Sequence, residues 1–137
     1  MDAFDVVDFA EGMNVVLTIW VFKRKRYPCG SVQKLKARIC ARGFEQIEGV
    51  DYFETFAPVV QWMTVRMMLI MTILLNLENK QIDYVNAFLQ SDLDTPVYVK
   101  MPKLFRQKDK VWKLKKSLYG LKNSPRQYFL HSKAKLD

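Results

Sequence analysis

Cysteine and histidine are scarce in this chain of 137 residues, which contains two cysteines and one histidine. These three residues are too few and too scattered in the sequence to form a structural or catalytic zinc site. They also argue against a disulfide framework, so a reducing environment is expected. A catalytic pair of one cysteine with His131 stays open, although no neighbouring residue supports it.

Long hydrophobic runs are also absent. The most apolar stretch, residues 67–77, is too short to span a bilayer, so no membrane association is expected. The N-terminus, MDAFDVVDFAEG, is acidic and lacks the basic start of a secretory signal. We therefore expect an intracellular protein, cytoplasmic or nuclear. The length corresponds to about one small domain, and the 50% hydrophobic content allows a sizeable core.

Basic residues outnumber acidic residues, and the two kinds of charge are concentrated in different segments of the chain. The formal charge is +8, with 22 basic and 14 acidic residues. Residues 13–44 contain eight basic residues and no acid, and residues 100–137 contain twelve basic residues and two acids. Residues 45–99 contain eight acids and two basic residues. Two basic segments around an acidic centre indicate a polyanion held near a carboxylate site. A solvated basic surface is the alternative.

A β-hairpin is predicted from two strand-like segments, residues 14–26 and 33–43, around the turn sequence YPCGS. Alternation along the second strand defines two faces. The apolar face, which should point into the core, contains Leu35, Ala37, Ile39 and Ala41. The basic face contains Lys34, Lys36, Arg38, Cys40 and Arg42. An exposed edge hairpin whose lysines only prevent aggregation is the alternative.

The remaining pattern predicts an α+β fold. Residues 64–78 have the length and composition of a helix that is apolar nearly all round, so we expect it to be buried on several sides. A last helix should begin near Ser124 or Pro125, after a turn at residues 120–125. Further strands are expected at residues 4–9, 80–89, 96–102 and 110–120.

Asp83 is unusual because it interrupts the apolar, strand-like run QIDYVNAFLQSDL. A buried acid at this point could cap a turn, pair with a cation or bind a metal. Two-metal chemistry needs more than one carboxylate. Asp92 and Asp94 are close in sequence, but they lie in a predicted polar turn, QSDLDTP, and should face solvent.

Several motifs, in order, resemble those of copia-type retrotransposon reverse transcriptases. The stretch WVFKRKR followed by KARICARGFEQIEGVDYFETFAPVV resembles the start of that domain. QIDYVNAFLQSDL resembles its first catalytic motif, and VWKLKKSLYGLKNSPRQYF resembles a later one. The resemblance covers about residues 11–130. It implies the fingers and part of the palm of a polymerase, with a basic hairpin and antiparallel palm strands packed on helices.

The resemblance also implies roles for individual residues. Asp83 matches the first metal-binding aspartate of the palm, and the backbone carbonyl of Tyr84 would be a further metal contact. The paired aspartates of a Y-V-D-D-type motif would lie beyond residue 137, so residues 1–137 are expected to be a partial domain, truncated before that motif. The nucleotide-binding positions implied by the match are Lys36, Arg38, Ala87, Phe88, Tyr119 and Gly120. Phe88 would disfavour a 2′-hydroxyl on the incoming sugar.

The resemblance thus implies an RNA-directed DNA polymerase that uses Mg²⁺, an RNA template, a DNA primer and deoxynucleoside triphosphates. The chain alone, without a second catalytic carboxylate motif, is expected to be inactive. Three residues depart from the usual pattern: Leu17 and Ser91 replace common glycines, and Ile19 replaces a common lysine. A domesticated nucleic-acid-binding module without catalysis and a non-functional remnant of a retroelement are the alternatives.

Overall fold

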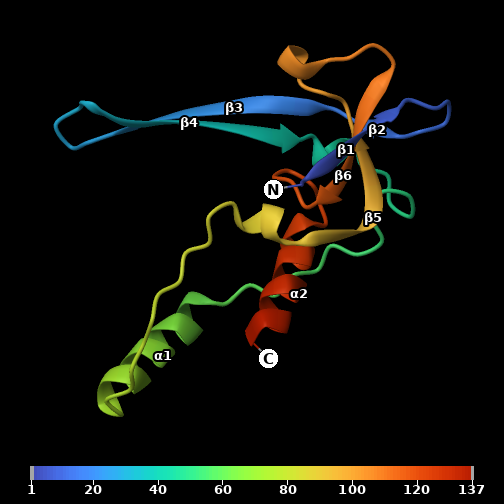
Figure 1. The fold of residues 1–137 in the computed structure, drawn as a ribbon. Helices are drawn as coiled ribbons and strands as arrows, with labels where there is room; N and C mark the ends of the chain where they lie inside the picture. Colours follow the sequence, from blue (N-terminus) through green and yellow to red (C-terminus); the bar gives the residue numbers. More distant parts are fainter. Residues whose placement is uncertain (1, 137) are drawn as a thin grey trace.

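The computed structural model describes residues 2–136, which form an α+β fold with two sheets and two α-helices (Figure 1). The α+β class predicted from the sequence is therefore confirmed. The strands are β1 (Phe4–Asp8), β2 (Val15–Val16), β3 (Thr18–Arg26), β4 (Val32–Ala41), β5 (Asp92–Val99) and β6 (Lys110–Lys116). The helices are α1 (Trp62–Leu74) and α2 (Ser124–Leu136), with 3₁₀ turns η1 (Gly43–Glu45), η2 (Ala87–Gln90) and η3 (Lys103–Phe105).

A four-stranded sheet with the order β1-β6-β5-β2 carries the core. The pairs β1–β6 and β5–β6 are antiparallel, whereas β2 pairs parallel to β5. The sheet is therefore mixed, whereas antiparallel strands were expected. Residues from the sheet, the base of β4 and the segment before α2 form one buried cluster. Its members are Val16, Ala41, Val97, Val99, Met101, Trp112, Leu114 and Leu121.

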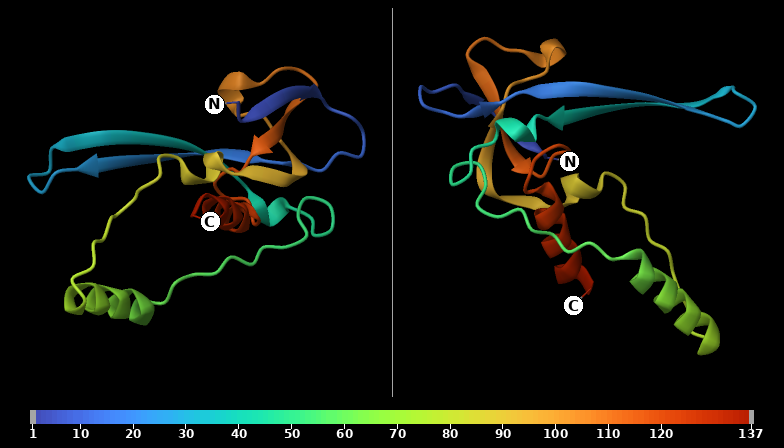
Figure 2. Two further views of the ribbon diagram at one scale, coloured as in Figure 1. Left: turned by 60° about the horizontal axis from the view of Figure 1, so that its bottom comes forward. Right: turned by 180° about the vertical axis from the view of Figure 1, so that it is seen from behind.

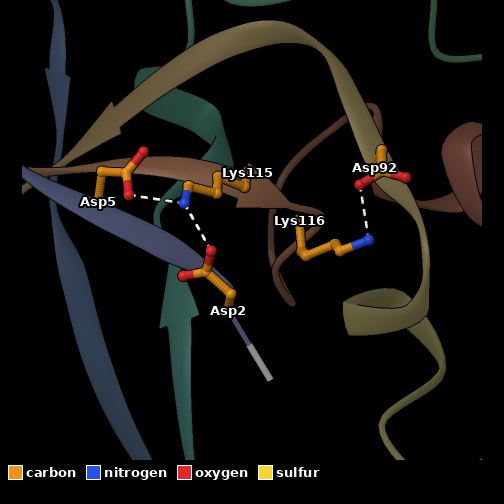
Figure 3. A network of polar contacts seen from close by, with 5 residues as sticks. All are labelled: Asp2, Asp5, Asp92, Lys115 and Lys116. Carbon is orange, nitrogen blue, oxygen red and sulfur yellow. Dashed lines mark hydrogen bonds and ion pairs between the residues drawn. The ribbon is translucent and has the colours of Figure 1, made fainter.

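Carboxylates attach the edge strand β1 to β6 (Figure 3). The ammonium of Lys115 lies 2.7 Å from an Asp2 oxygen and 2.6 Å from an Asp5 oxygen. The hydrogen bond and the charge of Lys115 lower the pKa of Asp2, and hydrogen bonds to Asp2 and Asp5 raise the pKa of Lys115. Exposed ion pairs of this kind stabilise a fold little, but they favour one strand register over its alternatives.

The second sheet is a two-stranded hairpin, β3 with β4, that projects beyond the four-stranded sheet (Figures 1 and 2). The single strand expected at residues 14–26 is divided at Leu17, whose backbone N–H donates to the Glu45 carboxylate at 2.7 Å. β2 can therefore pair with β5 while β3 pairs with β4.

The apolar face of the hairpin only partly reaches the core. Ala41 is buried and Ile39 packs against the core cluster, as predicted. Leu35 is 72% exposed and Ala37 is also exposed, so the prediction that they point into the core is wrong. The hairpin extends well beyond the sheet at its base, so its outer half lies away from the core cluster (Figure 1).

The apolar helix α1 forms where it was predicted, but it is not buried. None of its residues is buried, and Trp62 and Ile73 are 73% and 80% exposed. The segments before and after it carry it away from the sheet (Figures 1 and 2). The expectation of burial on several sides is therefore wrong, because helix formation is local whereas burial needs a neighbouring element.

The strand expected at residues 80–89 is also wrong. Residues 80–84 have no regular structure, and the chain then turns through Asn86, with φ of 53°, into η2. No strand pairs with this segment in the part of the chain that is described, and a strand needs a hydrogen-bonding neighbour. The turn expected before β5 is instead the first half of β5, although Asp92 and Asp94 are exposed as predicted.

Helix α2 begins at Ser124 as predicted and packs beside η2 and β5. Neither α1 nor α2, each of 13 residues, is long enough to cross a membrane, and residues 2–136 contain no other α-helix.

Candidate nucleotide-binding site

The basic face of the hairpin is built from both strands. The register places Lys23 opposite Lys36 and Lys25 opposite Lys34. Directly opposite residues of a β-ladder point to the same side, so β3 adds two lysines to the basic face of β4. The charge of Lys25 in particular, then desolvation and the neighbouring charges of Arg38, Lys34 and Lys23, lower the pKa of Lys36. Positive charge therefore accumulates on this face at some electrostatic cost.

This face borders a cavity of about 530 Å³, called here the hairpin cavity. Its wall is formed by residues 34–38 of β4, residues 83–86 and Tyr119. Asp83 is the one acid in the wall, opposite three basic side chains. It lies exposed in irregular chain rather than inside a buried apolar strand, so the expected burial is wrong. The cavity combines strong positive charge with a single carboxylate.

Aromatic rings support the wall of the hairpin cavity. The Arg38 guanidinium lies 5.5 Å from the centre of the Tyr119 ring, within the range of a cation–π contact. Behind Tyr119, the Phe88 ring packs edge to face at 4.6 Å between centroids. Tyr128 of α2 contacts both Phe88 and Tyr84, at 6.0 and 5.9 Å. Helix α2 thereby fixes the segment that presents Asp83.

Two glycines allow the Tyr119 segment to lie directly against the base of the hairpin. The Ala41 backbone N–H donates to the Tyr119 carbonyl at 2.7 Å. A Cβ on Gly120 would lie 2.1 Å from the Ala41 oxygen, and one on Gly43 would lie 2.0 Å from the Gly120 oxygen. Gly120 also has φ of +92°. Only glycine permits this approach, which sets Tyr119 against Arg38.

The loop after the hairpin is attached to the same segment by polar contacts. The buried Gln46 accepts a hydrogen bond from the Lys122 backbone N–H at 2.7 Å, and Asp51 accepts one from the Ile47 N–H at 2.8 Å. Arg126 pairs with Glu54 at 2.7 Å. These residues of the GFEQIEGVDYFE and SPR stretches therefore have structural roles in this loop and in its contact with Lys122.

The structure brings together five of the eight predicted site residues in the wall of the hairpin cavity. They are Lys36, Arg38, Asp83, Tyr84 and Tyr119. Ala87, Phe88 and Gly120 are not part of the wall, although Phe88 packs against Tyr119 and Gly120 follows it. Sequence reasoning missed Lys23, Lys25 and Gly43. The register of the hairpin places Lys23 and Lys25 on the basic face. That register depends on a bulged turn, and no signal in the sequence of the turn indicates it.

The residues of the cavity do not form a metal site by themselves. Within residues 2–136, no three histidine, cysteine, aspartate or glutamate side chains gather closely enough to hold an ion. Hard divalent cations such as Mg²⁺ prefer oxygen ligands, and here a lone carboxylate faces lysine and arginine. The wall is better suited to an anion, in particular a phosphate group.

Comparison with known proteins gives a consistent result. The sequence model of the family described as "Reverse transcriptase (RNA-dependent DNA polymerase)" matches residues 1–136. The chain is 38% identical over 130 residues to the "Retrovirus-related Pol polyprotein from transposon TNT 1-94" of Nicotiana tabacum. The matched region covers 93% of the chain and 10% of that protein. No solved structure matches the chain.

Other similar proteins are also transposon polyproteins. The identity is 40% over 121 residues to the "Retrovirus-related Pol polyprotein from transposon RE1" of Arabidopsis thaliana, covering 86% of the chain and 8% of that protein. It is 34% over 121 residues to the "Transposon Ty1-H Gag-Pol polyprotein" of Saccharomyces cerevisiae, covering 85% and 6%. The chain thus spans about a tenth or less of the length of these relatives.

Proposed function

The chain belongs to the reverse transcriptase (RNA-dependent DNA polymerase) family, and we propose that it forms the fingers and part of the palm of a copia-type RNA-directed DNA polymerase. The predicted resemblance to this family is confirmed by the match over residues 1–136. The family generally uses divalent metal ions, a nucleic-acid template and nucleotide substrates.

The observation that carries the proposal is the hairpin cavity. Lys36 and Arg38 line it from β4, two residues apart on one strand face. We assign them the triphosphate of an incoming deoxynucleotide, because ammonium and guanidinium groups make charge-assisted hydrogen bonds to phosphate oxygens. Lys34 in the same wall, with Lys23 and Lys25 opposite on β3, adds to the attractive field.

The sugar and base would occupy the aromatic side of the cavity. Tyr119 and Gly120 form the segment attached to the hairpin base, and Ala87 and Phe88 lie in η2 behind Tyr119. Phe88 is not itself in the wall, but its edge-to-face packing holds the Tyr119 ring that is, and this contact supports a role for Phe88 in sugar selection. In this proposal a 2′-hydroxyl is rejected by lack of space rather than by charge.

In this proposal Asp83 and the Tyr84 carbonyl would contact Mg²⁺ together with further carboxylates, because two-metal chemistry needs more than one. We assign no metal-dependent step to the chain alone, because a single carboxylate among cations does not hold two ions. RNA template and DNA primer are the polymer substrates in this proposal. The part of this work that we propose for Lys36 and Arg38 is to hold the nucleotide.

A titration of the chain with a deoxynucleoside triphosphate tests the proposal. Replacing Lys36→Gln and Arg38→Gln removes two phosphate partners and should weaken binding by about 1.5–3 kcal/mol per lost charged hydrogen bond. The control variant Lys133→Gln/Lys135→Gln removes the same charge from exposed positions of α2 and should bind as the parent does. Equal affinity of both variants would show that the cavity does not hold the triphosphate.

A further inference from the structure

A second basic cavity lies at the base of the hairpin, away from Asp83. It has a volume of about 420 Å³ and is called here the η3 cavity. The turn that carries η3 lies on the opposite side of the hairpin from residues 80–86 (Figures 1 and 2). None of the residues in its wall lines the hairpin cavity. The two cavities are therefore separate places on the molecule.

The wall of the η3 cavity contains four basic residues and no acid: Arg42, Lys100, Lys103 and Arg106. Arg42 pairs with Glu45 at 3.4 Å, but the Glu45 carboxylate also accepts the Leu17 N–H. Among residues 2–136, no carboxylate lies within ion-pair distance of the other three basic side chains. Gathered cations without counter-charges attract an anion.

The backbone that carries Lys100 is held by hydrogen bonds and by the core. The Thr18 hydroxyl donates to the Lys100 carbonyl at 2.7 Å, and the Lys100 N–H donates to the Val16 carbonyl at 2.9 Å. Met101, which follows, is 1% exposed and belongs to the core. Lys100 thus projects from an anchored segment, and a ligand need not order the backbone there in order to bind.

Aromatic rings beside the cations favour a single strand over other polyanions. Trp20 lines the η3 cavity, and its ring stacks with that of Phe22 at 5.9 Å and 10°. Phe22 is 74% exposed, so the stack is open to a further ring. Unpaired bases stack on exposed aromatic side chains, whereas a duplex keeps its bases paired within the helix and an acidic peptide has no bases.

We propose that the η3 cavity binds the phosphate backbone of a single-stranded nucleic acid, with a base stacked on Phe22. This site lies outside the cavity assigned to the nucleotide, and it relies on the proposed function only for the kind of polyanion. Lys100, Lys103 and Arg106 contact phosphates. A strand held here would pass along β3 on the side of the hairpin away from Asp83.

Binding of a fluorescent oligonucleotide at several salt concentrations tests this site. Lys100→Gln/Lys103→Gln removes two phosphate contacts, and the slope of log affinity against log salt should fall by about 1.4, since each contact to a single strand contributes about 0.7. The matched control is Lys133→Gln/Lys135→Gln, which removes the same charge from α2 and should leave the slope unchanged. An unchanged slope in the η3 variant overturns the proposal.

A second variant tests the stacking independently of charge. Phe22→Ala should weaken single-strand binding about 5- to 160-fold, the effect of losing one stacked base, without changing the salt slope. Competition by polyglutamate as strong as by the oligonucleotide, with no effect of Phe22→Ala, would assign the cavity to acidic peptides and overturn the proposal. Deoxynucleotide binding by the η3 variant should equal that of the parent, so failure of either cavity is recognised separately.

Discussion

At the scale of single residues, the site depends on glycine as much as on charge. Arg38 faces Tyr119 only because Gly120 lets the following chain approach Ala41. Gly120 needs both a positive φ and the absence of a side chain. Gly12 has the same φ of +92°, but a Cβ added there would have no atom within 4 Å. A comparison of substitutions at Gly12 and Gly120 therefore distinguishes the cost of backbone strain from the cost of steric overlap.

We predict that Gly120→Ala destabilises the fold more than Gly12→Ala does. Both variants place alanine at positive φ, which costs about 1–2 kcal/mol. Only Gly120→Ala also drives a Cβ to 2.1 Å from the Ala41 oxygen, which should add about 1–3 kcal/mol or disrupt the contact. Urea unfolding of both variants measures the difference. Equal losses would mean that the close approach at Gly120 has no energetic role.

At the scale of elements, local patterns in the sequence predicted elements better than their surroundings. Alternation placed Leu35 and Ile39 on one face of β4, and both do share that face. It could not show that the core ends near Ile39, because burial depends on the elements packed beneath the strand. The composition of α1 likewise predicted a helix, but not its distance from the sheet.

The residues of the candidate site were likewise predicted only in part. Lys36, Arg38, Asp83, Tyr84 and Tyr119, predicted from matched motifs, meet in one cavity. Lys23 and Lys25 were missed because the facing residues of a hairpin are set by its turn, and a register irregularity lies between Lys25 and Arg26. The strand expected around Asp83 failed because strand formation requires a partner that a single segment does not reveal.

We predict different costs for two alanine substitutions on the same face of β4. Leu35→Ala should change the free energy of unfolding by no more than about 0.5 kcal/mol, since the side chain is 72% exposed. Ile39→Ala should cost up to about 2 kcal/mol, the low end of the range for buried aliphatic residues, because Ile39 is only partly buried. Thermal or urea unfolding measures both. A larger loss for Leu35→Ala would contradict the exposed position of the outer hairpin.

At the scale of the whole molecule, two arms of different chemistry extend from the sheet (Figure 2). The hairpin is basic, whereas α1 is apolar all round and carries one charged residue, Arg66. Contiguous exposed apolar surface is rare on soluble monomers and marks interaction sites or aggregation-prone segments. The basic arm should repel its copies, so association between copies should depend on α1.

We predict that the chain associates with itself through α1. Ile73→Lys/Leu74→Lys should reduce association without unfolding, because both side chains are mostly exposed and lysine is favoured in the last turn of a helix. Leu104→Lys/Leu136→Lys is the matched control, since it adds the same charge at leucines that are 83% and 79% exposed outside α1. Sedimentation velocity at several concentrations measures the species. If both variants shift equally, added charge rather than loss of the apolar α1 surface explains the change.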